Sequence, residues 1–175
     1  MRIFIFILSL MISACATSPQ KKLEQLRPPM SALPGPIKLR QQLTIKSPKL
    51  NQSFEAVISV NKSEMKLVAL TSMGAILFSM DYDGKKLESS NPQMQKLADL
   101  VMSDILLASM STDELKRYLP QGLSILDKVQ LRTVLNRDQE LVKISYVNRK
   151  AWPREFVLVR LSQGYELKVR TIEEL

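Results

Sequence analysis

The chain has 175 residues, of which 45% are hydrophobic and 24% are charged, and its formal net charge is +8. This length accommodates one domain of ordinary size together with a terminal extension. The sequence contains no histidine, which excludes Ser-His-Asp triads, Cys-His dyads, a histidine general base and metal sites that depend on imidazole. Its single cysteine excludes a disulfide within the chain.

The first fourteen residues have the pattern of a secretory signal peptide. Arg2 supplies a positive charge, an apolar run follows over residues 3–11, and small residues end with Ala14 directly before Cys15. The apolar run is shorter than the roughly 20 residues that a helix needs to cross a bilayer, so we expect no transmembrane anchor. We therefore predict that residues 1–14 are removed by cleavage between Ala14 and Cys15.

The segment Ile12-Ser13-Ala14-Cys15 resembles the lipobox of bacterial lipoproteins. The resemblance implies that Cys15 carries acyl chains such as palmitate and anchors the mature protein in a membrane. Ala16 stands where an inner-membrane retention signal has Asp, which implies the outer membrane, with the protein facing the periplasm. The alternative is an ordinary signal peptide cleaved after Ala14, which leaves a free thiol at Cys15.

Residues 15–36 are rich in proline and show no sustained apolar period. This composition predicts a linker, which at about 3.1 Å per residue in an extended form could reach roughly 60 Å from the membrane. We therefore expect residues 15–36 to form a lipidated tether and residues 37–175 to form the folded domain.

Apolar and polar residues alternate with a period of two beyond residue 37, which predicts strands. Phe54 and Ile58 share one face of the clearest such strand. Two hairpins are expected next, the first turning at Ser72-Met73-Gly74 and the second at Asp83-Gly84. Further alternating segments after residue 129 predict a second set of strands.

Two helices are predicted between the two sets of strands. Asn91-Pro92 supplies an N-cap and a proline at the first helical position. One face of this helix carries Met94, Leu97, Ala98, Val101 and Ile105, and the opposite face carries Gln95, Lys96, Asp99 and Ser103. Ser111 and Glu114 form a capping box for a short second helix. The order of strands, helices and strands predicts an α+β fold in which helices cover one face of an antiparallel sheet.

A lipobox, a proline-rich segment and antiparallel strands around a helical insertion resemble the LolB family of outer-membrane lipoprotein receptors. The nearest local similarity is LVALTSMGAILFSMDYDG, residues 67–84, which is similar to the strand-turn-strand core of LolB-related lipoproteins often encoded beside aryl polyene biosynthesis genes. The resemblance implies a LolB/LolA-like incomplete β-barrel with a helical lid. It also implies a lipid or lipoprotein ligand and a periplasmic carrier protein as a partner.

Ten apolar residues are candidates to line the acyl-chain cavity that this resemblance implies. They are Phe54, Ile58, Leu67, Phe78, Met80, Leu131 and Phe156 in the barrel, and Leu97, Val101 and Ile105 in the lid. The alternative is that the same positions form a filled, dry core, since periodicity does not distinguish a packed interior from a pocket.

Met73 matches the exposed leucine of a protruding LolB loop that acts when lipoprotein passes to the membrane. The resemblance therefore implies a membrane or lipid transfer loop at this residue. Two departures are present, because Met replaces Leu, and Ser72 stands where the family often has Pro. The alternative is a hairpin-tip residue folded back on the sheet.

No catalytic constellation is visible, so we expect no enzymatic activity, no cofactor and no metal site. Asp81-Tyr82-Asp83-Gly84 lacks the third acidic ligand of a calcium loop. Arg149-Lys150 and Arg154 flank Trp152-Pro153, an arrangement that could meet an anionic ligand at a barrel rim or form a plain turn. Nucleic-acid binding is not expected of an exported lipoprotein.

These observations predict an outer-membrane-anchored periplasmic lipoprotein that binds or transfers a lipid or an acylated ligand. That ligand is a lipoprotein or an aryl-polyene-type lipid. The alternative is a non-catalytic envelope assembly accessory, whose packed barrel docks a protein partner.

Overall fold

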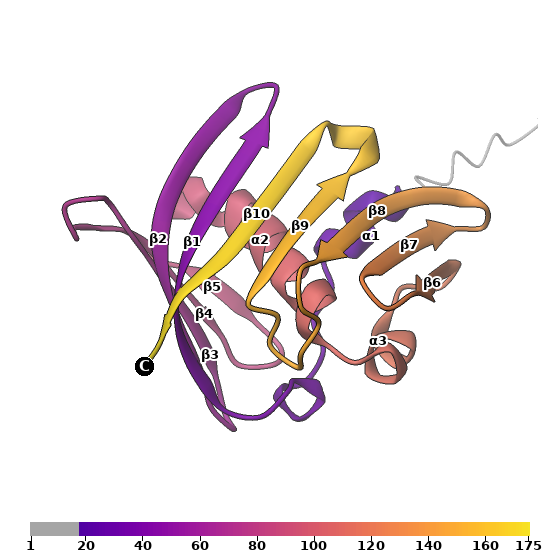
Figure 1. Ribbon diagram of the computed structural model, residues 1–175, viewed down its shortest axis with the longest axis horizontal. Helices are drawn as coiled ribbons and strands as arrows, with labels where there is room; N and C mark the ends of the chain where they lie inside the picture. The colour runs from indigo at the N-terminus through magenta and orange to yellow at the C-terminus, as the bar shows by residue number, and fades with distance from the viewer. Residues whose placement is uncertain (1–17) are drawn as a thin grey trace, which may run out of the picture.

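The computed structural model describes residues 18–175 (Figure 1). Ten strands form one antiparallel sheet in the order β5-β4-β3-β2-β1-β10-β9-β8-β7-β6. The strands are β1 (Ile37–Ser47), β2 (Leu50–Val60), β3 (Met65–Leu70), β4 (Ile76–Tyr82), β5 (Leu87–Ser89), β6 (Leu123–Asp127), β7 (Leu131–Asn136), β8 (Gln139–Tyr146), β9 (Glu155–Arg160) and β10 (Tyr165–Glu174). The first and last strands pair at the centre. The predicted α+β fold with an antiparallel sheet is confirmed, and the sheet is large and open.

The helical segments are α1 (Pro19–Glu24), η1 (Met30–Ala32), η2 (Pro92–Met94), α2 (Gln95–Ser109), α3 (Thr112–Tyr118) and η3 (Leu161–Gln163). Asn91 accepts a hydrogen bond from the backbone N–H of Gln93 at 3.0 Å, as expected of a residue that caps the first turn. Ser111 caps α3 by accepting from the N–H of Glu114 at 3.2 Å. The predicted start of α3 is therefore confirmed, whereas Asn91 caps η2, the short turn that leads directly into α2.

The predicted helical lid is not confirmed, because α2 is an interior layer of the fold. The helix runs along the concave side of the sheet (Figure 1). Every residue from Val101 to Ser109 is buried. Ser103, which the sequence placed on the polar face, is fully buried. A lid would need one solvated face, whereas this half of α2 is enclosed on all sides, including at its polar residues.

The other side of α2 is covered by the N-terminal segment, residues 18–36, which we call the strap. Leu23 and Leu26 are 0% and 2% exposed and belong to the main core. Arg27 pairs with Asp99 of α2 at 2.5 Å. The structure therefore differs here from the extended tether predicted from composition, because two leucines three residues apart supply an apolar stripe that packs on the domain.

Successive turns of an antiparallel meander lie at alternate ends of the sheet. The β1–β2, β3–β4 and β9–β10 turns share the end that we call the upper end, after the β1–β2 and β9–β10 turns in Figure 1. The strap begins there, where Gln163 of η3 donates to the Glu24 carboxylate at 2.7 Å. It reaches the opposite, lower end beside the β8–β9 loop, where the indole N–H of Trp152 donates to the carbonyl oxygen of Gly35 at 3.0 Å.

Candidate functional site

The β3–β4 turn carries an exposed methionine on a well-defined backbone. The N–H of Thr71 donates to the carbonyl oxygen of Ala75 at 2.8 Å, and the N–H of Gly74 donates to that of Thr71 at 2.9 Å. Gly74 has φ +79°, a conformation that L side chains rarely adopt. Met73 is 92% exposed, which excludes the alternative in which it folds back on the sheet.

Two further apolar side chains are exposed beside Met73. Ile76 and Leu77 at the start of β4 are 69% and 47% exposed. We call Met73, Ile76 and Leu77 the apolar tip. Figure 1 shows this hairpin projecting past the neighbouring strands. The β3–β4 register shifts between Ala69 and Leu70, so strand alternation did not predict the exposure of Ile76.

Nine of the ten cavity candidates belong to the main core or pack against it, three of them on α2 itself. Leu131 is the exception, because it lies on β7 outside this core. Among the described residues, none of the ten lines the mouth pocket described below. The buried members are Phe54, Ile58, Leu67, Phe78, Met80, Val101, Ile105 and Phe156, and the partly buried ones are Leu97 and Leu131. The rings of Phe54 and Phe78 pack edge to face with centroids 5.9 Å apart. In the structure α2 therefore fills the concave side of the sheet. An acyl-chain cavity at these residues stays a prediction.

A buried ion pair joins α2 to the sheet. Arg160 donates from Nε to Asp104 Oδ1 at 2.9 Å and from Nη2 to Ser103 Oγ at 2.8 Å. Burial raises the pKa of Asp104 to about 6, although the positive charge of Arg160 acts in the opposite direction. Asp104 Oδ2, Arg160 Nη1 and the Tyr165 hydroxyl are buried without a hydrogen-bond partner. This pair was not predicted, although Arg160 has the same strand parity as Phe156 and therefore faces the core.

A second ionic cluster closes the C-terminal end of α2. The fully buried Arg132 contacts both carboxylate oxygens of Asp127 at 3.0 Å and donates to the carbonyl oxygen of Met110 at 2.9 Å. Arg149 donates to the same carboxylate at 2.7 Å, and its guanidinium lies 5.1 Å from the centre of the Tyr146 ring. Burial favours a raised pKa for Asp127, but the hydrogen bonds from Arg132, Arg149 and Thr112 outweigh it and lower the pKa.

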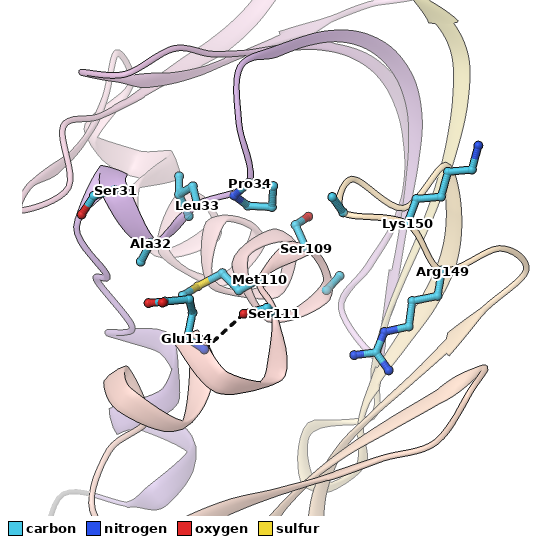
Figure 2. A pocket seen from close by; sticks show the side chains of 12 residues that line it. Ser31, Ala32, Leu33, Pro34, Ser109, Met110, Ser111, Glu114, Arg149 and Lys150 are labelled. Carbon is cyan, nitrogen blue, oxygen red and sulfur yellow. Dashed lines mark hydrogen bonds between the residues drawn. The ribbon is translucent and has the colours of Figure 1, made fainter.

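A pocket of about 550 Å³ opens at the lower end of the sheet (Figure 2). We call it the mouth pocket. Its walls are residues 31–34 of the strap, residues 108–111 and Glu114 where α2 meets α3, and residues 149–151 of the β8–β9 loop. The volume of the mouth pocket lies within the range of roughly 300–1,000 Å³ that is typical of small-molecule sites.

The basic residues that the sequence grouped around Trp152 separate in the structure. Arg149 and Lys150 line the mouth pocket. Arg154 instead pairs with Glu174 of β10, and Trp152 is buried. The predicted alternative was a plain turn. The β8–β9 loop does more than that, since it also forms one wall of the mouth pocket.

Comparison with known proteins places the chain in a family. A model of proteins of unknown function, DUF3261, matches residues 38–173. The chain belongs to this family. The match begins within β1 and ends in β10, so it includes the whole sheet and leaves out the strap. No curated protein matches the chain.

Three solved structures resemble this fold at low sequence identity. A LolA superfamily protein from Nitrosomonas europaea has a TM-score of 0.44 and 9% identity over 89% of this chain and 90% of its own. A putative outer membrane lipoprotein-sorting protein domain from Vibrio parahaemolyticus has a TM-score of 0.41 and 11% identity over 90% and 93%. MucB has a TM-score of 0.42 and 12% identity over 90% of this chain and 57% of its own.

Within residues 18–175 the side chains include no cluster of three or more acidic or cysteine residues that could hold a metal ion. In the same part of the chain, no helix has both the length and the apolar character needed to span a bilayer.

Proposed function

We propose that this DUF3261 protein is a lipoprotein of the outer membrane that faces the periplasm and binds or transfers a lipid or an acylated ligand. In this proposal Cys15 is acylated after cleavage at Ala14, and the apolar tip enters the bilayer during transfer. The observation that carries the proposal is that the apolar tip and the start of the strap lie at the same end of the sheet.

Chain length sets how far the folded domain can lie from the anchor. Ser18, the first described residue, stands three positions after Cys15. One residue spans at most about 3.6 Å, so an acylated Cys15 holds Ser18 within about 11 Å of the head groups. Because α1 contacts η3 at the upper end of the sheet, that end faces the bilayer.

The surface of the upper end suits a membrane. Met73, the most exposed large apolar residue among residues 18–175, lies on a turn that backbone hydrogen bonds hold in place. Lys46 and Lys49 are exposed beside the β1–β2 turn at the same end. Apolar side chains can enter the interface while basic ones contact anionic head groups. We propose a lipoprotein or an aryl-polyene-type lipid as the ligand and a periplasmic carrier as its donor.

Photocrosslinking in the native host tests this proposal with the full chain. Cells grown with a diazirine-bearing palmitate are irradiated, and adducts on the purified protein are identified by mass spectrometry. We expect acyl adducts of a lipid or lipoprotein on the domain, in addition to any acyl chains on Cys15. Met73→Glu should reduce their yield, because a carboxylate opposes entry into the bilayer, and the matched variant Met73→Leu should keep it.

The packed interior around α2 favours one second candidate function, an assembly accessory that docks a protein partner. It predicts crosslinks to protein and none to acyl chains. A domain free of acyl adducts would therefore overturn the lipid proposal and support the accessory.

A further inference from the structure

We propose that the mouth pocket binds the anionic head group of a single-chain amphiphile, a carboxylate or a phosphate, through Arg149. The inference rests on the proposed function for the acyl part of the ligand, and it adds the head group and the place where it binds. It assigns a role to the basic loop at residues 149–151, which neither the predicted cavity nor the apolar tip includes.

The ionic cluster behind the pocket leaves one positive charge in excess. Asp127 carries a single negative charge, and its lowered pKa keeps it ionised at neutral pH. Arg132, fully buried, contacts both oxygens of this carboxylate and so balances that charge. The charge of Arg149 is therefore left for a group outside the cluster. Charge-assisted hydrogen bonds to guanidinium are about twice as strong as neutral ones.

Arg149 is held in place before any ligand arrives. Its Nη2 donates to Asp127 at 2.7 Å and its Nη1 donates to the carbonyl oxygen of Lys128 at 3.2 Å. The Tyr146 ring supports the guanidinium plane, and the Tyr146 hydroxyl is itself fixed by donating to the carbonyl oxygen of Ala108 at 3.0 Å. Two of the five N–H groups of Arg149 are thus engaged, and within residues 18–175 the other three have no hydrogen-bond partner. Fixing the donors in advance lowers the entropy cost of binding.

The remaining walls of the pocket suit the apolar part of such a ligand. Ala32, Leu33 and Pro34 of the strap lie opposite the β8–β9 loop, and Met110 lies between them (Figure 2). Glu114 is the one acidic residue in the lining, and Arg117 pairs with it at 2.8 Å. Figure 2 shows Glu114 on the side of the pocket away from Arg149. The site therefore combines a fixed cation with an apolar wall, which is the chemistry of an anionic amphiphile.

The position of the mouth pocket indicates from which side a ligand reaches it. It lies at the lower end of the sheet, whereas the apolar tip lies at the upper end. With the upper end on the bilayer, the mouth pocket opens away from the anchoring membrane. An amphiphile delivered from the periplasm meets this end of the protein first.

Head-group dependence is tested with the purified full chain in nanodiscs. The probes are a diazirine-bearing palmitic acid and its methyl ester, which differ only in the charge of the head. Labelled peptides are mapped by mass spectrometry, and half-saturating concentrations are measured for each probe. Competition with lysophosphatidic acid and with palmitate distinguishes a phosphate head from a carboxylate head.

We expect the acid to label peptides of the mouth pocket at a concentration at least about tenfold below that of the ester. Arg149→Gln should remove this preference, and Arg149→Lys should keep part of it. Lys116→Gln, an exposed charge change on α3 outside the pocket, is the matched control and should leave the preference intact. Ala151→Trp adds a large side chain at the exposed rim of the pocket and should reduce labelling by both probes.

The outcomes separate this inference from the proposed function. Acyl labelling that lies elsewhere, or that is the same for acid and ester, overturns the mouth-pocket site and leaves lipid binding standing. No acyl labelling by either probe overturns lipid binding itself. A thermal unfolding midpoint that is unchanged in Ala151→Trp shows that its loss of labelling comes from the filled pocket.

Discussion

Arg160 of β9 and Asp104 of α2, 56 residues apart in the chain, form an ion pair with both side chains at 0% exposure. Arg160 also contacts Ser103, so one strand holds two adjacent residues of the helix. Removing charges from water is costly, and this pair keeps polar atoms unpartnered as well. The pair therefore orients α2 on the sheet at an energetic cost.

Replacing one partner should cost more than replacing both. Arg160→Met leaves the Asp104 carboxylate buried and unpaired, and we expect it to lower the free energy of unfolding by about 3–5 kcal/mol. The double variant Asp104→Leu/Arg160→Met removes both charges and should recover most of that loss. Urea unfolding of the purified proteins measures both. A double variant no more stable than Arg160→Met would contradict this account of the pair.

The raised pKa of Asp104 predicts how stability depends on pH. Its folded-state pKa of about 6 lies above the ordinary value of 3.8, so the folded protein binds a proton that the unfolded chain releases. The contribution of Asp104 to stability should therefore increase as pH falls from 7 towards 4. The negative charge of Glu24 raises the same pKa in part, while Arg160 and Tyr165 lower it.

Asp104→Asn is the reference for this measurement, because it removes the titrating group and keeps the shape. The free energy of unfolding of the wild type, relative to that of Asp104→Asn, should increase as the pH falls from 7 to 5. Parallel pH profiles for the two proteins would mean that Asp104 has the same pKa in the folded and unfolded states.

The packing of the strap predicts that its leucines contribute to stability. We expect Leu23→Ala to lower the free energy of unfolding by about 2–5 kcal/mol, because it deletes a fully buried side chain. Arg27→Ala should cost about 1 kcal/mol or less, since the Arg27–Asp99 pair is partly exposed. Urea titrations of the three proteins make the comparison. An extended tether would instead give no loss for Leu23→Ala.

The proposed orientation on the membrane is measurable with single introduced cysteines. Cys15 is the one native cysteine, and acylation would consume its thiol. A fluorophore on Met73→Cys at the apolar tip should be quenched by nitroxide-bearing lipids. The same fluorophore on Lys62→Cys, in the β2–β3 turn at the lower end, should not be quenched. Equal quenching at both positions would rule out an upper end that faces the bilayer.

Local chemistry was sufficient for much of the fold. Alternation predicted the strands, Gly74 and Gly84 marked turns that need positive φ, and Asn91 and Ser111 predicted the helix starts. These features depend on neighbours within a few residues, so the sequence alone contains them. The hairpin tip at Met73 was predicted as well, but the sequence left open whether the side chain is exposed or folds back on the sheet.

Contacts between residues distant in the chain decided the rest. Whether α2 is a lid or an interior layer depends on what covers its second face, and the strap that does so precedes it by some 70 residues. The mouth pocket likewise combines walls from three separate segments, and the ionic cluster that frees the charge of Arg149 needs Arg132 from another strand. The sequence by itself determined most strands, the two central helices and the composition of the basic loop, but not the helical turns of the strap. Only the tertiary structure decided which side chains meet, because burial and charge balance are properties of the whole packed fold.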